Sequence, residues 1–196
     1  GTQVSRAVGK SVSLQQLNGA SREEFVSALR PLFNNETWPL ELAWESRPFG
    51  DVNELRAAIQ VAVLTADDSR RAALIHDYPA MDELLLADAD EAATISADRG
   101  SLGLTDLDDV QTERITELSA AYRERFDMPF VAYLDTNDTV DRVIDAGVRR
   151  LANSPEQEYR TALGEIVEIA NDRFDILLAD ANPVRSSWDR KFTEVD

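Results

Sequence analysis

Apolar residues recur at three- and four-residue steps along most of this chain, the spacing of one buried face of an α-helix. The clearest case is 155–180, where Leu163, Ile166, Ala170 and Phe174 follow one another at these steps. Similar patterns predict further helices near 21–33, 51–64, 67–77, 105–126 and 138–152. Shorter helical segments are expected at 13–18, from Trp38-Pro39 to about Arg47, and at 81–86. No strand-like alternation is evident, so the chain is predicted to be all-α, a single compact multi-helix domain.

Helix starts are marked by capping residues. Ser21 and Glu24 form the S-x-x-E pattern, in which two side chains satisfy free N–H groups at a helix start. Asp51 and Glu54 have the same spacing. Ser154-Pro155 places a capping serine before a proline at the first helical position.

The secondary structure of one short apolar run cannot be assigned from the spacing of its residues. Phe130-Val131-Ala132-Tyr133-Leu134 is too short to separate a strand from an extended segment buried between helices. Both readings stay open at this point.

The ends of the chain differ from its middle. Residues 1–12 are polar and are expected to be a flexible N-terminal segment, 13–181 the helical domain, and 182–196 a polar C-terminal tail. The first segment lacks the apolar core of a secretory signal, and no run approaches the roughly 18 apolar residues of a membrane span. We therefore expect a cytoplasmic protein with no membrane partner.

The charge and composition of the chain argue against several classes of function. The net charge is −17 and the pI about 4.4, so the surface repels phosphate backbones and no nucleic-acid partner is expected. An anionic ligand would need a locally positive pocket. The chain has no cysteine and a single histidine, His76, which excludes thiol chemistry and multi-histidine metal sites within one chain. We expect no metal and no cofactor, and we read His76 as a surface residue.

Five segments carry a family resemblance: LNGASREEF from Leu17, RPF at 47–49, LIHDYPAMDELL from Leu74, ISADRGSLGL from Ile95, and SAAYRERFDMPFVAYL ending at Leu134. Together they make residues 14–178 similar to the 2-oxo-4-hydroxy-4-carboxy-5-ureidoimidazoline (OHCU) decarboxylase family. The resemblance implies an all-α fold and a cofactor-free carbon–carbon lyase of purine metabolism. Such enzymes act in urate degradation and form S-allantoin and CO2.

The family's active-site motifs match in spacing but not in residue type. Tyr78-Pro79 stands where the family has His-Pro. Ile95, Asp98 and Arg99 stand at the serine, glutamate and glutamine of its Ser-x-x-Glu-Gln segment. The intervals from Tyr78 to Asp98 and from Arg99 to Phe130 need no insertion or deletion, which supports the register.

The resemblance also implies roles. In the family the histidine is the proposed proton donor and the carboxylate–amide pair helps to hold the substrate, so Tyr78 and Asp98 are the catalytic candidates. A tyrosine hydroxyl, with an unperturbed pKa of about 10, is a weaker acid than imidazole, at about 6.5. Substrate-binding candidates are Pro79, Ile95, Arg99 and the segment Phe130, Val131, Ala132, Tyr133 and Leu134. The family motif Phe-Gly-Phe-Pro-Phe becomes FDMPF, which puts Asp127-Met128 in the place of Gly-Phe.

Each candidate also has a plainer interpretation. Asp98 and Arg99 could form a solvated loop pair, Tyr78 could pack its ring under a loop with the hydroxyl at the surface, and 130–134 could be ordinary core. The functional alternatives are a lyase of this type with an altered substrate, a catalytically inactive homologue that binds a small ligand or regulates, and a module that binds partners through its acidic helices. The expected ligand is a small anionic, nitrogen-rich metabolite, and a homodimer is left open.

Overall fold

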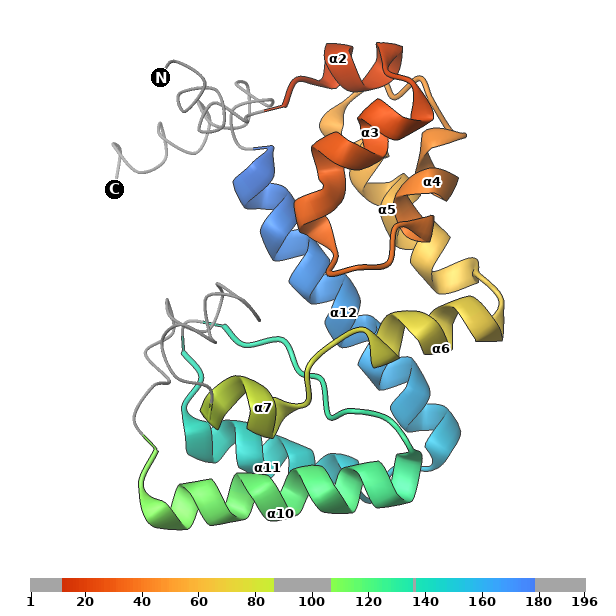
Figure 1. The fold of residues 1–196 in the computed structure, drawn as a ribbon. Coiled ribbons are helices and arrows are strands. Elements are labelled where there is room, and N and C mark those ends of the chain that lie inside the picture. Colours follow the sequence, from red (N-terminus) through yellow and green to blue (C-terminus); the bar gives the residue numbers. More distant parts are fainter. Residues whose placement is uncertain (1–11, 87–106, 136, 179–196) are drawn as a thin grey trace, which may run out of the picture. The chain divides into compact units, whose positions relative to one another are not determined.

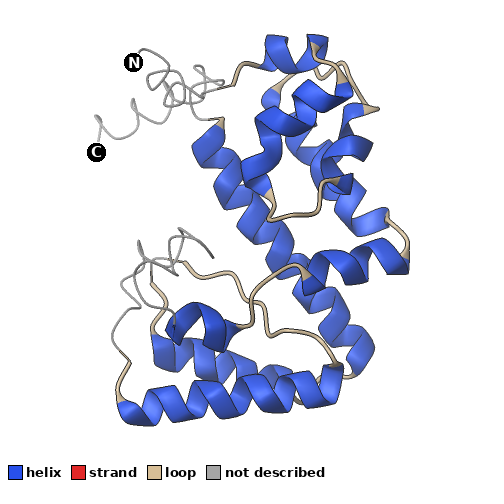
Figure 2. Cartoon of the chain, viewed as in Figure 1, coloured by secondary structure: helices blue, strands red, loops and turns tan. Residues whose placement is uncertain are grey.

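The structure is a computed structural model that describes residues 12–86, 107–135 and 137–178. Within these ranges every regular element is a helix, and no strand is present (Figure 2). This confirms the all-α prediction. Contacts between Cα atoms divide the chain into two compact units, residues 1–70 with 170–196 and residues 71–169. The two unit boundaries fall inside helices α6 and α12, and each unit is described separately below.

The first unit is built from five short elements and the end of α12. These are α2 (Leu14–Gly19), α3 (Arg22–Leu29), the 3-10 turn η1 (Arg30–Leu32), α4 (Trp38–Trp44) and α5 (Val52–Thr65). Its core is formed by fully buried apolar side chains, namely Phe25, Leu29, Leu32, Leu40 and Leu55. Helix α5 is tied to the end of α12 by polar contacts, because Arg56 Nη2 lies 2.6 Å from Asp175 Oδ1 and Gln60 Nε2 donates to Asn171 Oδ1 at 2.8 Å.

Arg47 of the RPF triplet stabilises this unit. Its Nε donates to the carbonyl of Trp44 at 2.9 Å, and its Nη1 donates to the carbonyls of Asn18 and Ala20 at 2.9 and 2.8 Å. These carbonyls lie at the ends of α4 and α2, where helix carbonyls lack partners within the helix. Arg47 therefore has a structural role.

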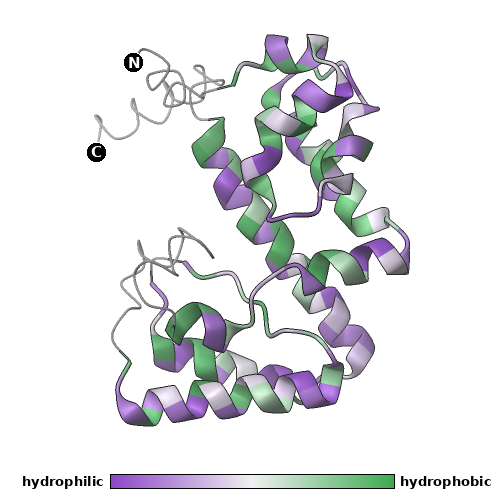
Figure 3. Cartoon of the chain, viewed as in Figure 1, coloured by the Kyte–Doolittle hydropathy of each residue, from purple (hydrophilic) through white to green (hydrophobic). Residues whose placement is uncertain are grey.

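The second unit contains most of α6 (Asp68–His76), then α7 (Met81–Leu86), α10 (Asp109–Phe126), α11 (Val140–Arg150) and the first part of α12 (Pro155–Leu177). Helix α10 packs against both α7 and α11 (Figure 1). Hydrophobic and hydrophilic residues alternate around the α10 ribbon, as expected of a helix with one buried face (Figure 3). The buried face of α10 carries Ile115, Leu118 and Tyr122.

Capping hydrogen bonds confirm several of the predicted helix starts. Ser21 and Glu24 form the predicted reciprocal box, and Ser154 accepts from the N–H of Gln157 at 3.2 Å. Asp51 forms only half of its box, because the Glu54 carboxylate instead accepts from the N–H of Gly50 at 2.8 Å. Helix α10 begins at Asp109 rather than at the predicted 105, because Asp108 is its cap and accepts from Gln111 N–H at 2.7 Å.

The predictions for the two ends of the chain are not tested by the structure, and the prediction about membranes is tested only for the described helices. The flexible segment 1–12 and the tail 182–196 remain predictions, since almost all of their residues lie outside the described ranges. Among the helices that are described, none has the length and apolar character needed to cross a membrane.

Candidate functional site

Tyr78 and Pro79 lie directly after α6 in the second unit. The N–H of Tyr78 donates to the carbonyl of Ile75 at 3.2 Å and so closes the last turn of the helix. The Tyr78 side chain is 6% exposed and its hydroxyl oxygen is buried, which rules out the interpretation that placed this hydroxyl at the surface. His76 is exposed, as predicted. The tyrosine at the expected proton-donor position is therefore an interior residue.

Three other candidates, Ile95, Asp98 and Arg99, lie outside the described residues. Their convergence with Tyr78 stays a prediction.

The segment Phe130–Leu134 is an irregular stretch between α10 and α11, neither helix nor strand (Figure 2). Phe130 is fully buried, and its ring centroid lies 5.3 Å from that of Tyr122. The Arg150 guanidinium lies 4.8 Å from the Phe130 centroid, within cation–π range. Of the two readings left open by the sequence, the strand is excluded, and the segment is an irregular stretch with Phe130, Val131 and Leu134 buried.

Two helices hold the backbone of this segment through side chains. Arg150, at the end of α11, donates from Nη1 to the carbonyl of Val131 at 2.8 Å. Glu165, on α12, accepts from the N–H of Tyr133 at 3.0 Å through Oε1. The segment thus obtains, from side chains, hydrogen bonds that a strand would obtain from a neighbouring strand.

A buried carboxylate fixes Arg150. Glu158 is 0% exposed and accepts hydrogen bonds from the Tyr122 hydroxyl, from Arg150 Nε at 2.6 Å and from Asn153 Nδ2 at 2.9 Å. A buried charge requires this degree of pairing, because desolvation of an unpaired carboxylate is costly. The sequence pattern did not predict this cluster. The available signal was a tyrosine on a buried helix face, followed by Arg150, Asn153 and Glu158 around a helix start.

Burial also raises the pKa values of two side chains near this segment. The pKa of the Tyr122 phenol is raised, first by burial and then by its hydrogen bond to Glu158. The pKa of Glu165 is raised by burial, and the Tyr133 N–H and Arg150 partly oppose that shift. Two carboxyl groups, Glu158 and Glu165, accompany the single guanidinium of Arg150, so these three groups together do not make a positive pocket. An anionic ligand here would need a further cation, and Arg99 is the candidate supplied by the sequence.

Asp127 explains one departure from the family pattern. It follows the last residue of α10 with φ 55° and ψ 41°, a left-handed conformation, and its N–H donates to the carbonyl of Arg123 at 2.8 Å. Glycine, the family residue here, adopts this conformation most easily, and aspartate is among the few other residues that tolerate it. The substitution therefore preserves the helix end that leads into Phe130.

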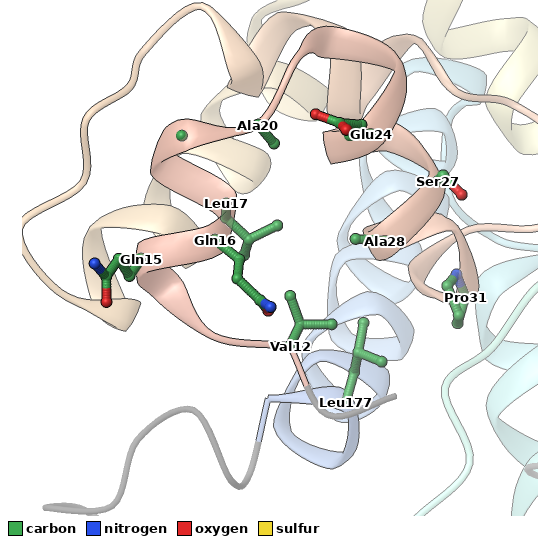
Figure 4. Close-up of a pocket in the computed structure, with 11 residues that line it drawn as sticks. Val12, Gln15, Gln16, Leu17, Ala20, Glu24, Ser27, Ala28, Pro31 and Leu177 are labelled. Atoms are coloured by element: carbon green, nitrogen blue, oxygen red, sulfur yellow. The ribbon is translucent and has the colours of Figure 1, made fainter. Parts of the chain in front are cut away.

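A pocket is present in the first unit but contains none of the predicted site residues. It has a volume of about 730 Å³ and lies between α2, α3 and the end of α12 (Figure 4). Leu17, Ala28, Pro31 and Leu177 form part of its wall. Its one charged lining residue, Glu24, is already engaged in the cap of α3. An acidic, mostly apolar wall does not suit an anionic ligand.

Comparison with known proteins decides the family. Residues 18–175 match the family model described as OHCU decarboxylase. The chain belongs to the OHCU decarboxylase family. It is 37% identical over 164 residues to the 2-oxo-4-hydroxy-4-carboxy-5-ureidoimidazoline decarboxylase of Haloferax volcanii, covering 83% of this chain and 94% of that protein. It is 32% identical over 181 residues to the mouse protein of the same name, covering 89% and 98% of the two chains.

A solved structure supports the fold. A crystal structure of (S)-allantoin synthase aligns with a TM-score of 0.65 at 22% identity. The alignment covers 85% of this chain and 54% of that one, so the chain spans about half the length of the solved protein. At this identity the likeness concerns the fold alone. The resemblance carried by the motifs around Tyr78 and Phe130 thus leads to the same family as the whole-chain comparisons.

Proposed function

We propose that this protein is a cofactor-free carbon–carbon lyase that decarboxylates OHCU to S-allantoin and CO2 in urate degradation. The observation that carries the proposal is the match of residues 18–175 to the OHCU decarboxylase family, together with the 37% identity to a relative covered over 94% of its length.

The reaction has simple requirements. The bond between the ring carbon and its carboxylate breaks, CO2 leaves, and the electron pair stays on the ring system. One proton is then added to the neighbouring ring carbon, which bears the ureido group, while the hydroxyl on the first carbon loses its proton and becomes the carbonyl of S-allantoin. The protein must hold the anionic substrate, stabilise the developing charge and deliver the proton, all of which side chains and backbone N–H groups can do.

The candidate residues divide these tasks. Tyr78, with its hydroxyl buried, is proposed to donate a hydrogen bond or the proton where the family uses histidine. Arg99 is proposed to bind the substrate carboxylate, because a guanidinium fork suits that group. Asp98 is proposed to orient the ligand or to hold Arg99, and the Phe130–Leu134 backbone to line the same pocket.

The same proposal covers the ligand, the cellular location and the partners of the reaction. The ligand is a small anionic, nitrogen-rich metabolite, the location is cytoplasmic, and no metal, cofactor, nucleic acid or membrane is required. A homodimer is compatible with this function. The net charge of −17 supports the absence of a nucleic-acid partner.

The test is turnover of freshly generated OHCU, followed by the circular dichroism of the S-allantoin formed. S-allantoin formation well above the uncatalysed rate supports the proposal, and Arg99→Ala should then raise KM. If the parent and Tyr78→His both fail to accelerate the reaction, the lyase assignment is wrong. Calorimetric binding of S-allantoin by such an inactive chain would favour the small-ligand-binding homologue.

A further inference from the structure

The two anchors of the Phe130–Leu134 segment lie on one side of its backbone. In an extended chain the N–H and C=O of one residue point to the same side, and those of the next residue to the other. The Val131 carbonyl, bound by Arg150 at 2.8 Å, and the Tyr133 N–H, bound by Glu165 at 3.0 Å, are two residues apart and so share a side.

The backbone groups on the opposite side of the segment are not anchored by hydrogen bonds. Among the described residues, the backbone groups of Phe130, Ala132 and Leu134 have no hydrogen-bond partner. Residues with anchored backbone groups thus alternate with residues without them, the pattern expected of an extended chain. Ala132 is also only half-buried, although its neighbours Phe130 and Val131 are buried. The backbone at Ala132 is therefore the part of the segment best placed to meet a ligand.

The Arg150 anchor is itself held at several points. Arg150 is bound to Glu158, which is also bound by Tyr122 and Asn153. Its side chain is only 11% exposed, and its guanidinium lies over the Phe130 ring. An arginine fixed at this many points can hold a carbonyl in one place, whereas a solvated arginine could not.

We propose that Arg150 and Glu165 are positioning residues, which bind one side of the Phe130–Leu134 backbone and thereby present the Ala132 N–H on the other side to the substrate. The inference rests on the proposed function and extends it to two residues outside the expected site. Neither residue touches the reacting atoms. A displacement of about 1 Å in such a segment can reduce the rate by about 100-fold.

Glu165 offers the sharper test, because its acceptor can be kept or removed at similar size. Glu165→Gln keeps an oxygen that can accept from the Tyr133 N–H, whereas Glu165→Leu does not. We expect kcat/KM for OHCU to fall about 10- to 100-fold in Glu165→Leu and to stay within about threefold of the parent in Glu165→Gln. Glu168→Leu, an exposed position on the same helix, is the matched control and should behave as the parent.

Arg150→Lys tests the second anchor without removing the positive charge that Glu158 needs. A lysine ammonium lacks the fork that reaches Glu158 and the Val131 carbonyl together. We expect a similar fall in kcat/KM, with Arg149→Lys, which is exposed, as the control. A purely structural role would lower kcat with the unfolded fraction, leave KM unchanged and be reversed by cooling. A rise in KM in fully folded protein supports positioning instead.

An activity-independent measurement separates this inference from the lyase assignment. Amide hydrogen exchange at Tyr133 should be faster in Glu165→Leu than in the parent or Glu165→Gln, and titration with S-allantoin should shift the Ala132 amide resonance. If the parent turns over OHCU and both anchor variants match it, the positioning role is wrong and the lyase assignment stands. If the parent is inactive, the Ala132 shift decides: its presence supports the inference, and its absence overturns it.

Discussion

Gly147 lies so close to Phe130 that a Cβ atom at Gly147 would sit 2.9 Å from Phe130 Cζ. The same atom would also clash with Leu118 Cδ2. Glycine in the middle of α11 therefore allows α10 and the Phe130 ring to pack directly against the helix backbone. Helix α11 gives up some intrinsic stability for this contact, since glycine is a poor helix former.

Gly147→Ala is expected to lower the free energy of unfolding by about 1–2 kcal/mol, because overpacking outweighs the gain in helix propensity. Gly164, inside α12, is the matched control, because a Cβ there has nothing within 4 Å. Gly164→Ala should stabilise by about 0.5–1 kcal/mol. Urea unfolding of both variants measures the contrast. An equal gain in the two would show that Leu118 and Phe130 move aside freely.

The buried Glu158 cluster is expected to dominate the stability of the second unit. Glu158→Gln leaves Arg150, only 11% exposed, without its charge partner, so we expect a loss of roughly 3–5 kcal/mol. Tyr122→Phe removes one donor and keeps the ion pair, so the loss should be nearer 1–3 kcal/mol.

Exposed Glu168 supplies the control for this cluster, and Glu168→Gln should stay within about 0.5 kcal/mol of the parent. The measurement is again urea unfolding at neutral pH. A Glu158→Gln variant as stable as Glu168→Gln would mean that Arg150 finds another partner or reaches solvent.

Local signals in the sequence were enough to predict the elements. Ser21, Asp108 and Ser154 are capping residues whose partners lie three residues away, so the pattern and the hydrogen bond are nearly the same information. The predicted start near 105 is earlier than the observed start of α10 at Asp109, because the apolar period alone does not identify Asp108 as the cap.

The Arg150–Glu158 cluster could not be predicted in this way. Its members come from α10, α11 and the start of α12, and their convergence depends on how these helices pack. Taken singly, Arg150 and Glu158 look like surface charges, since such residues are seldom fully buried. The sequence leaves the form of Phe130–Leu134 open between a strand and an extended segment, because its hydrogen bonds go to side chains distant in sequence.

The acidity of the chain predicts a dependence on salt. With 37 acidic and 20 basic residues, the folded state is subject to self-repulsion. Raising ionic strength from 0.1 to 1 M shortens the screening length from about 10 to 3 Å, so the melting temperature should rise. Thermal scans across a KCl series measure this. Screening predicts a plateau near 1 M, whereas a steady linear rise beyond it would point to ion exclusion instead.

Glu165 predicts a pH dependence of stability. Burial raises its folded pKa, so the fold favours the protonated carboxyl more than the unfolded chain does. The stabilisation is fully present below the unfolded value of 4.5 and is lost as the pH rises through the raised folded value. Stability relative to Glu165→Gln, which does not titrate, should therefore decline as the pH rises from 4.5.

Urea unfolding of the parent and Glu165→Gln across pH 4.5–7 gives this difference directly. The groups that act on Glu165 are Arg150 and the Tyr133 N–H, which favour its charge, and Glu158 and Glu168, which oppose it. A difference that grows with pH would mean that Arg150 and the Tyr133 N–H outweigh burial.

Tyr78→His is expected to increase the rate of OHCU decarboxylation. The position is interior, with the native side chain 6% exposed, so an imidazole there would be shielded from bulk water. Imidazole donates a proton readily near neutral pH, and a well-placed general acid contributes roughly 10²–10⁴-fold. The expected gain lies at the lower end of this range, because the surrounding residues are arranged around a larger ring. His76→Gln, at the exposed histidine two residues earlier, should leave the rate unchanged.

Tyr78→Phe completes the comparison, because it removes only the hydroxyl. If Tyr78 donates the proton, the phenylalanine variant should be slower than the parent, and the order of rates should be histidine, tyrosine, phenylalanine. Equal rates for tyrosine and phenylalanine would show that the hydroxyl takes no part. A parent as fast as Tyr78→His would show that this protein has a different proton donor, and the undescribed segment with Asp98 would be the first place to search by substitution.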